Sequence, residues 1–478
     1  MRGKRLLDEA PLFRALWELR DHASFHVPGH HGGRHFPAFA RRWFAPCLRF
    51  DATELPGLDN LHAPEGVIRE AEARAAEVFG AEETKFLVGG STAGILALIL
   101  GTEVALPRRP WIVERASHAS VWNGLSLAGA EAVVLPNPVD SHGLPHPPEE
   151  ATFREVLRRY PDAKAVLLTS PTYFGFRGPL RSLIRTAKRA GLLVYVDEAH
   201  GAHFRFSRRL PRPALDLGAD AVVQSLHKTL PVMGMGSLLH FRGKDVPREA
   251  VREALRALET SSPSYVLLAT MDLARAWYAL RGRTMVRRAL NAQVAFRKSL
   301  ARIPWLRVLP ADDPFRLILL APPGEGARLE EHLRRHKVYC ELVLGDAILC
   351  LLSPGNRGFW RQLYRALASY RPRTDGVRNE EGERSAGEGF FKNFASVPPS
   401  RVSFRFFWGE KVAEVPLSRA LGRVSARALI PVPPGIPLVL PGERISSSHL
   451  VALARLGELG HPVLGLGRDG RIWVLDEA

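Results

Sequence analysis

Short apolar runs alternate with helix-length segments through the middle of the 478-residue chain. The runs cover residues 111–113, 132–135, 165–168, 192–196 and 221–224. A strand that is buried on both faces has no polar side to present, so runs of this kind are typical of a mostly parallel sheet covered by helices. The pattern therefore predicts an α/β fold.

Helical spacing of apolar residues marks two further segments. It extends over residues 68–79, where Gly80 predicts the end of a helix, and over residues 265–300. A third amphipathic stretch, residues 6–20, lies in a region rich in histidine, glycine, proline and aromatic residues. We interpret this region as an extended N-terminal arm.

Changes in the pattern predict five parts and no internal repeat. After residue 300 the runs become those of a smaller α/β unit, followed by a segment rich in charge and glycine and then by proline clusters. The predicted parts are an N-terminal arm (1–67), a large domain (68–300), a small α/β domain (301–370), a flexible linker or loop (371–392) and a compact C-terminal domain (393–478).

Composition and charge narrow the class of protein. The chain is 46% hydrophobic and 24% charged, as globular proteins are, and its 66 Lys plus Arg exceed its 49 Asp plus Glu by 17 charges. Net positive charge is compatible with nucleic-acid binding, but the chain has no block of like charges to serve as a binding arm. We therefore expect no nucleic-acid partner and interpret the arginine excess as a general bias of the composition without a functional role.

Cysteine usage and the absence of long apolar runs predict the compartment. Cys47, Cys340 and Cys350 lack the paired spacing of a disulfide framework or a zinc site, so no metal is expected. Charged residues interrupt the N-terminus, unlike a signal peptide, and no run approaches the roughly 18 apolar residues of a membrane span. The expectation is a cytoplasmic protein without a membrane partner.

Lys228 is the most informative single residue. It follows the apolar run 221–224 in a chain that has ten lysines against 56 arginines. One interpretation is a side chain that reaches the surface from a strand end. The other is a need for an amine that loses its proton and forms an imine, which arginine cannot do. The flanking residues Ser225 and His227 add donors that suit a phosphate.

Three other segments place polar groups after apolar runs. Asp197 follows the run 192–196, His118 follows the run 111–113, and GGSTAG at 89–94 precedes a helical stretch. Separately, each has an ordinary structural interpretation as a helix cap or a buried histidine. Open α/β sheets, however, gather ligand-binding groups at the carboxyl ends of their strands. The order phosphate turn, histidine, aspartate, lysine is therefore much more specific than any one member.

With these motifs the sequence resembles the bacterial ornithine/lysine/arginine decarboxylases. Those enzymes have the pyridoxal phosphate (PLP) fold type I, which is the aspartate aminotransferase fold. The resemblance covers nearly the whole chain outside the segment 371–392. Its motifs are FHVPGHHGG (25–33), DATELPGLDNLHAPEG (51–66), GGSTAG (89–94), SPTYFG (170–175), VDEAHGAH (196–203), QSLHKTLP (224–231), TSSPSY (260–265), EVPLSRALGRVSA (414–426) and PPGIPLVLPGE (433–443). His31, Ala119, Val432 and the stretch 232–236 depart from the family pattern, which bears on the substrate.

The resemblance implies a role for each matched residue. Lys228 would hold PLP as an imine, Asp197 would pair with the pyridine nitrogen, and His118 would stack on the ring, opposite Ala199. The implied catalytic residues are Lys228, Asp197, His118 and His227. The implied cofactor-binding residues are Ser91, Thr92, Ala93, His118, Asp197, Ala199, His200, Ser225, His227, Lys228, Ser261 and Ser262, with Ser261 and Ser262 acting across a homodimer interface. Candidates for binding a cationic substrate side chain are Glu54, Asp59, Glu341 and Glu443.

The implied reaction is α-decarboxylation of a basic amino acid in polyamine synthesis. Arginine, which would give agmatine, is the favoured substrate, followed by lysine and ornithine, which would give cadaverine and putrescine. A PLP-dependent aminotransferase of the same fold is an open alternative. An alternative of another class is a basic nucleic-acid-binding or regulatory protein that retains the cofactor fold.

Overall fold

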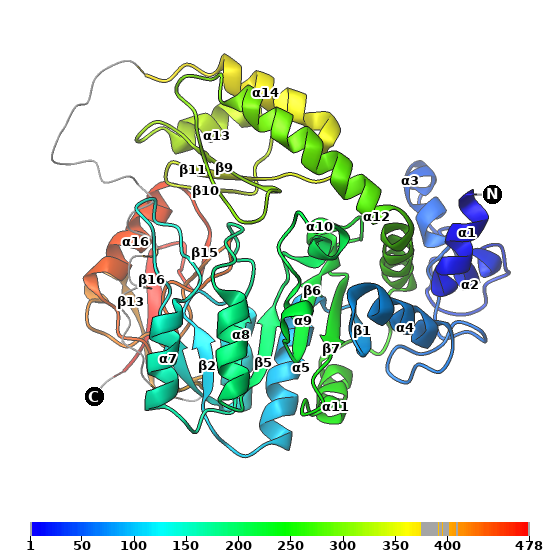
Figure 1. The fold of residues 1–478 in the computed structure, drawn as a ribbon, viewed down its shortest axis with the longest axis horizontal. Coiled ribbons are helices and arrows are strands. Elements are labelled where there is room, and N and C mark those ends of the chain that lie inside the picture. The colour runs from blue at the N-terminus through cyan, green and yellow to red at the C-terminus, as the bar shows by residue number, and fades with distance from the viewer. Residues whose placement is uncertain (1, 374–390, 392–393, 395–400, 408–409, 477–478) are drawn as a thin grey trace. The chain divides into compact units, whose positions relative to one another are not determined.

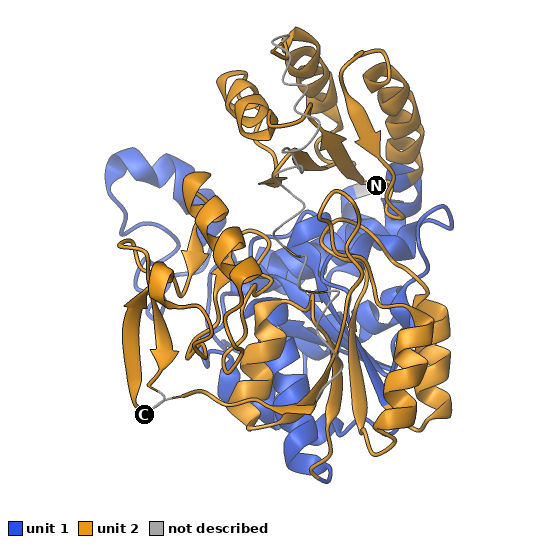
Figure 2. Cartoon of the chain, turned by 90° about the vertical axis from the view of Figure 1, so that its left-hand side faces the viewer, with its two compact units in different colours: residues 1–107, 193–286 blue, residues 108–192, 287–478 orange. Residues whose placement is uncertain are grey.

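The computed structural model describes residues 2–373, 391, 394, 401–407 and 410–476 (Figure 1). The chain divides into two compact units (Figure 2). Unit 1 comprises residues 1–107 and 193–286, and unit 2 comprises residues 108–192 and 287–478. Most of the predicted linker 371–392 lies outside the described residues. Within the described part of the chain, no helix combines the length and the apolar character that crossing a membrane requires.

Unit 1 contains four strands in the order β1-β7-β6-β5. They are β1 (Glu83–Leu87), β5 (Leu193–Asp197), β6 (Ala221–Ser225) and β7 (Ser237–Phe241). β5 and β6 are parallel, whereas β7 is antiparallel to both β6 and β1. Every residue of β5 and β6 is buried, which explains their apolar sequences. The strands predicted at 192–196 and 221–224 are thus confirmed.

The helices of unit 1 follow local sequence signals. They are α1 (Arg2–Glu9), α2 (Pro11–Leu19), α3 (Ala38–Leu48), α4 (Val67–Phe79), α5 (Gly90–Ala105), η1 (Ala202–Phe206), α9 (Ala214–Leu217), α10 (Leu226–Thr229), α11 (Arg248–Leu258) and the start of α12 (Tyr265–Leu300). α4 ends at Gly80, which has a φ of 78° that suits glycine, as predicted. Pro11 divides the amphipathic stretch 6–20 into two helices, because proline lacks the N–H that a helix interior requires.

Unit 2 has a parallel sheet, a second sheet and a C-terminal part. The parallel strands run in the order β4-β2-β3, with β12 antiparallel to β3, and the second sheet is antiparallel throughout. The strands are β2 (Trp111–Glu114), β3 (Glu131–Leu135), β4 (Ala165–Thr169), β8 (Arg307–Leu309), β9 (Arg316–Leu320), β10 (Leu342–Leu344), β11 (Ala347–Leu351), β12 (Arg401–Ser403), β13 (Val412–Pro416), β14 (Ile430–Pro431), β15 (Val463–Leu464) and β16 (Arg471–Leu475). The three strands predicted between residues 111 and 168 are confirmed.

The helices of unit 2 complete an α/β architecture. They are α6 (Ala119–Ala128), α7 (Glu150–Arg159), α8 (Leu180–Arg189), α13 (Gly326–Arg335), η2 (Arg357–Phe359), α14 (Trp360–Ser369), η3 (Leu417–Arg419) and α16 (Ser447–Glu458). One apolar cluster includes Phe174, Ile318 of the second sheet, and Leu438 and Leu453 of the C-terminal part. The predicted α/β fold class is confirmed.

A buried arginine ties the C-terminal part to the end of β2. Arg115 has its side chain 1% exposed. Its guanidinium donates to the carbonyl oxygens of Pro437 (2.7 Å) and Leu438 (2.7 Å), and it pairs with Glu443 at 3.2 Å. Burial lowers the pKa of Arg115, and Glu443 opposes that shift. The acceptors of one buried charge therefore all come from residues more than 300 positions later in the chain.

Candidate active site

Two parallel strands of unit 1 end in the residues that the sequence singles out. Asp197 is the last residue of β5, and Lys228 lies in α10, the single turn that follows β6. The Asp197 side chain is buried, and its Oδ1 accepts a hydrogen bond from the N–H of Ala199 at 3.0 Å. Lys228 Nζ lies 3.2 Å from His200 Nε2. A carboxylate and an amine are thus presented at the same edge of the sheet.

The glycine-rich turn comes to the same edge through α5. Ser225 Oγ, at the end of β6, donates to Ser91 Oγ in the first turn of α5 at 2.9 Å. Gly94 allows this approach, because a Cβ there would lie 2.7 Å from Leu87 and 3.2 Å from Val223. A helix N-terminus with two hydroxyl groups beside it is suited to a phosphate.

These residues fit PLP. The cofactor requires an amine for its carbonyl carbon, an acid beside its ring nitrogen and donors for its phosphate. Lys228, Asp197, and the Ser91–Ser225 pair with the first turn of α5 are of those types. In addition, the Thr229 hydroxyl, next to Lys228, is buried without a hydrogen-bond partner among the described residues. Buried polar groups are rarely left unpaired, so a ligand group is a suitable partner.

His227 is held as a neutral imidazole. Its Nδ1 lies 3.2 Å from the carbonyl oxygen of Gly236. Burial lowers the pKa of His227, the Gly236 carbonyl raises it in part, and the positive charge of Lys228 lowers it further. The net shift is downward, so His227 carries no charge near neutral pH.

The other predicted cofactor residues of unit 1 differ in exposure. Ala93, Ala199 and His200 are buried, whereas Thr92, Ser261 and Ser262 are exposed. Ser261 and Ser262 follow α11 in the segment TSSPSY. Their action across a dimer interface stays a prediction.

His118 lies in unit 2, where it caps α6. Its Nδ1 accepts from the N–H of Ser120 at 3.2 Å and lies 2.9 Å from Ser120 Oγ, so the neutral ring carries its proton on Nε2. Gly435 abuts the ring, since a Cβ there would lie 2.9 Å from Nε2, and its carbonyl oxygen accepts from the N–H of Ala119 at 2.9 Å. The imidazole is therefore held in place, and its stacking on PLP stays a prediction.

The four carboxylates predicted to bind substrate have protein partners in the structure. Asp59 accepts N–H bonds at the start of α4, and although burial raises its pKa, the N–H groups of Glu65, Asn60, Gly66 and Arg69 lower it overall. Glu54 accepts from Thr53 Oγ1 at 2.6 Å, and Glu341 accepts from the Tyr173 hydroxyl at 2.6 Å. Glu443 pairs with Arg115. A substrate role for any of them stays a prediction.

Two buried glutamates near the site escape sequence reasoning. Glu259 accepts N–H bonds from Val88 and Gly89, and Glu198 accepts from Gln224 Nε2 at 2.6 Å. Glu259 is 170 residues from Gly89. No local pattern reports such a contact, although the position of Glu259 directly before TSSPSY is a weak signal.

A lysine and an acid at the ends of adjacent parallel strands, beside a helix N-terminus suited to a phosphate, are the arrangement expected of a PLP-dependent fold type I enzyme. The comparisons with known proteins identify the family. Residues 10–315 match the family model described as Orn/Lys/Arg decarboxylase, major domain, and residues 390–458 match the model of its C-terminal domain. The chain belongs to the Orn/Lys/Arg decarboxylase family.

The relatives agree with the family model. The uncharacterized protein YaaO of Bacillus subtilis is 39% identical, covering 93% of this chain and 94% of that protein. Arginine decarboxylase of the same organism is 30% identical (96% and 95% covered), and lysine decarboxylase LdcA of Pseudomonas aeruginosa is 25% identical (92% and 74%). Lysine decarboxylase LdcF of Francisella novicida, a crystal structure, has a TM-score of 0.82 at 19% identity, covering 98% of this chain and 81% of that chain, which shows the fold.

The enzyme class follows from the family. The chain is a PLP-dependent decarboxylase of a basic amino acid, and thus a carbon–carbon lyase. Family membership favours this activity over the aminotransferase and over the basic regulatory protein.

Proposed function

We propose that the protein decarboxylates L-arginine to agmatine. The observation that carries the proposal is the similarity to named arginine decarboxylases of Bacillus subtilis and Halalkalibacterium halodurans, which are 30% and 31% identical to this chain over nearly their full lengths. The named lysine decarboxylase of P. aeruginosa is 25% identical and is covered over 74% of its length. Agmatine is a precursor of polyamines, so the reaction would belong to polyamine synthesis.

The roles of the site residues are part of the proposal. Lys228 would hold PLP through its amine, and the Asp197 carboxylate would stabilise the protonated ring nitrogen. Ser91, Ser225 and the N–H groups of the first turn of α5 would bind the phosphate. When bound, PLP supplies an electron sink for the charge that remains when carbon dioxide leaves. Lys228 Nζ would return a proton to the α-carbon, because the one proton of the neutral His227 ring is directed at the Gly236 carbonyl oxygen.

A product screen tests the proposal. The purified protein is loaded with PLP, supplied separately with arginine, lysine and ornithine without any keto acid, and assayed for carbon dioxide and amine. We expect carbon dioxide and agmatine from arginine, and loss of both in Lys228→Ala, which lacks the amine. Cadaverine or putrescine as the main product would reject arginine as the substrate. Product formation that requires a keto acid would indicate an aminotransferase instead.

We further propose a cytoplasmic homodimer. Large apolar side chains are exposed on the arm, with Phe25, Phe39 and Trp43 exposed by 98%, 80% and 70%. Phe39 and Trp43 are four residues apart in α3 and so lie on one face of that helix, which favours a protein interface that a second copy would cover. All three cysteines are free thiols, including Cys340 and Cys350, whose sulfur atoms lie 3.5 Å apart. Unbonded thiols suit a reducing compartment.

A further inference from the structure

The turn between β1 and α5 is held by one buried carboxylate. Glu259 Oε1 accepts hydrogen bonds from the N–H groups of Val88 (2.9 Å) and Gly89 (2.8 Å). The residue is 9% exposed. Val88 and Gly89 directly precede Gly90, where α5 begins. Glu259 therefore fixes the path by which the chain enters α5.

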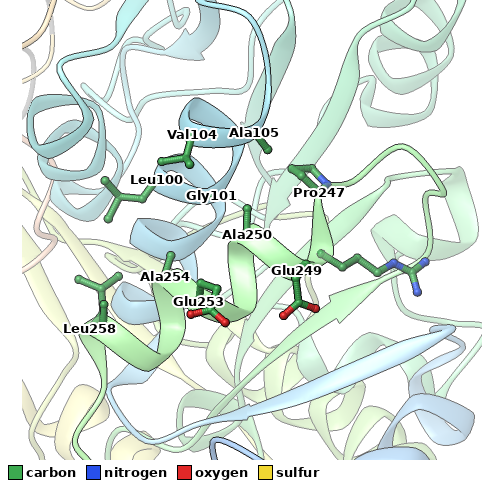
Figure 3. Close-up of a pocket in the computed structure, with 12 residues that line it drawn as sticks. Leu100, Gly101, Val104, Ala105, Pro247, Glu249, Ala250, Glu253, Ala254 and Leu258 are labelled. Carbon is green, nitrogen blue, oxygen red and sulfur yellow. The ribbon is translucent and has the colours of Figure 1, made fainter.

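The backbone of Glu259 is held in place by the end of α11. This residue is the C-cap of α11, and its N–H donates to the carbonyl oxygen of Leu255 at 2.9 Å. α11 packs against α5 so closely at Gly101 that a Cβ there would lie 2.6 Å from the Val251 nitrogen. Apolar side chains of both helices line the neighbouring groove (Figure 3). The carboxylate thus stands at one end of a tightly packed pair of helices.

The held turn leads directly into the predicted phosphate donors, since Gly89 is the N-cap of α5. A Cβ on Gly89 would lie 2.9 Å from the Cβ of Ala93 and 3.4 Å from Glu259 Oε1. Ala93 is in the first turn of α5, whose N–H groups would bind the phosphate. On the other side, Ser225 Oγ donates to Ser91 Oγ in the same turn. Glu259 and Ser225 therefore restrain the first turn of α5 from two directions.

We infer that Glu259 is a positioning residue for the phosphate end of the cofactor site. It holds Val88 and Gly89 so that the first turn of α5 points its N–H groups at the phosphate. The inference rests on the proposed phosphate-binding role of Ser91, Thr92 and Ala93. It adds a residue that touches neither substrate nor cofactor.

Glu259 acts as a hydrogen-bond acceptor, and holding the turn does not require its negative charge. A carboxylate close to a phosphate repels it, so charge alone would weaken cofactor binding. Burial raises the pKa of Glu259, although the N–H groups of Gly89 and Val88 lower it in part. Glutamine keeps an acceptor oxygen at the same position without the charge. Glu259→Gln should therefore preserve the site, whereas Glu259→Ala should not.

Cofactor affinity of the apo-protein is the measurement that tests this inference. PLP is titrated into each variant and the dissociation constant is taken from the absorbance of the bound cofactor, with the melting temperature without cofactor as a check on folding. Loss of two hydrogen bonds should weaken binding about tenfold in Glu259→Ala. Glu259→Gln should stay within about twofold of wild type. Glu259→Asp, in which the carboxylate is drawn back by one methylene, replaces Glu259→Ala if the latter does not fold.

Asp220→Asn serves as the matched control. Asp220 is buried and accepts from the N–H of Val194 at 2.8 Å, near the start of β5 and thus away from Asp197 at its end. PLP affinity in this variant should match wild type. Wild-type affinity in Glu259→Ala, equal weakening in the Gln and Ala variants, or equal weakening in Asp220→Asn would each overturn the inference. If wild type itself binds no PLP, the proposed function fails instead.

Discussion

At the scale of single residues, His240 shows how burial fixes a protonation state. In β7 its Nδ1 lies 2.8 Å from Thr84 Oγ1 and its Nε2 lies 3.2 Å from Gln224 Oε1. One neutral ring satisfies both contacts, with Nε2–H donating to Gln224 and Nδ1 accepting from Thr84. Burial lowers the pKa of His240 to about 3. The residue therefore folds as a neutral ring and resists protonation.

Acid should consequently weaken the fold through His240. An unfolded chain protonates the ring below its ordinary pKa of 6.5, whereas the folded chain does not do so until about 3. The stabilising contribution is complete above pH 6.5 and is lost as the pH falls toward 3. Between pH 7.5 and 5.0 this residue should remove about 2 kcal/mol from the free energy of unfolding.

Urea unfolding of wild type and His240→Gln at pH 7.5 and 5.0 measures this contribution. Glutamine does not titrate, so the variant should lose about 2 kcal/mol less than wild type between the two pH values. An equal loss in both proteins would mean that other groups account for the acid sensitivity.

The positions of the candidate site residues were predictable where they follow a recognisable element, while their roles stay predictions. Lys228 and Asp197 follow apolar strands, and a strand end is visible as the end of an apolar run. Glu259 and Glu198 were not predictable, because their partners lie elsewhere in the chain. A buried hydrogen-bond acceptor produces no periodic pattern in the sequence, and only the folded chain shows which groups donate to it.

At the scale of elements, the contact between α5 and α11 depends on the absence of a side chain. A Cβ on Gly101 would lie 2.6 Å from the nitrogen and 2.7 Å from the Cα of Val251. These are backbone atoms, so only a shift of the whole helix would relieve the clash. The same two helices support the turn at Gly89, so their packing affects the site.

Gly101→Ala should therefore destabilise the protein, although alanine favours helices. We expect a loss of about 1 to 3 kcal/mol in the free energy of unfolding, measured by denaturant titration. Gly457 is the matched control, since it also lies in a helix, α16, and a Cβ there meets nothing within 4 Å. Gly457→Ala should be neutral or stabilise by up to about 1 kcal/mol. A stabilising effect at both glycines would show that the α5–α11 contact is not tight.

Elements were predictable when their residues face apolar surroundings on all sides. The inner strands meet that condition, whereas the helix 265–300 was predictable from the helical spacing of its apolar residues, since it buries some of its side chains and exposes others such as Trp277. β1 and β7 were missed, since ETKFL and SLLHF mix polar with apolar residues and resemble neither a buried run nor a clean alternation. The break of 6–20 at Pro11 depends on one residue against an otherwise continuous amphipathic pattern. The boundaries of the five predicted parts stay predictions.

At the scale of the whole molecule, the proposed homodimer depends on the arm. Phe39 and Trp43 lie in α3 and are largely exposed. Phe39→Glu with Trp43→Glu places two charges among these aromatic groups and should prevent burial against a second copy. Sedimentation should then give the mass of the 52.9 kDa chain, whereas wild type gives twice that mass.

Val104→Glu is the control for the arm variant. Val104 is 83% exposed and lines the groove between α5 and α11, outside the arm (Figure 3). This variant should remain dimeric. If it becomes monomeric while the arm variant stays dimeric, the interface lies at the groove and the arm has another role.

The hydrogen bonds of the buried Arg115 guanidinium restrict the replacement of one family domain by that of another protein. The major-domain match ends at residue 315 and the C-terminal match begins at residue 390, which suggests separable modules. Arg115 belongs to the first and its acceptors to the second, and a buried charge without acceptors costs about 3 to 5 kcal/mol. During synthesis, the Arg115 guanidinium at the end of β2 lacks its full set of acceptors until the ribosome has made Glu443. A chimera that replaces only the C-terminal module must therefore supply acceptors at the positions of Pro437, Leu438 and Glu443.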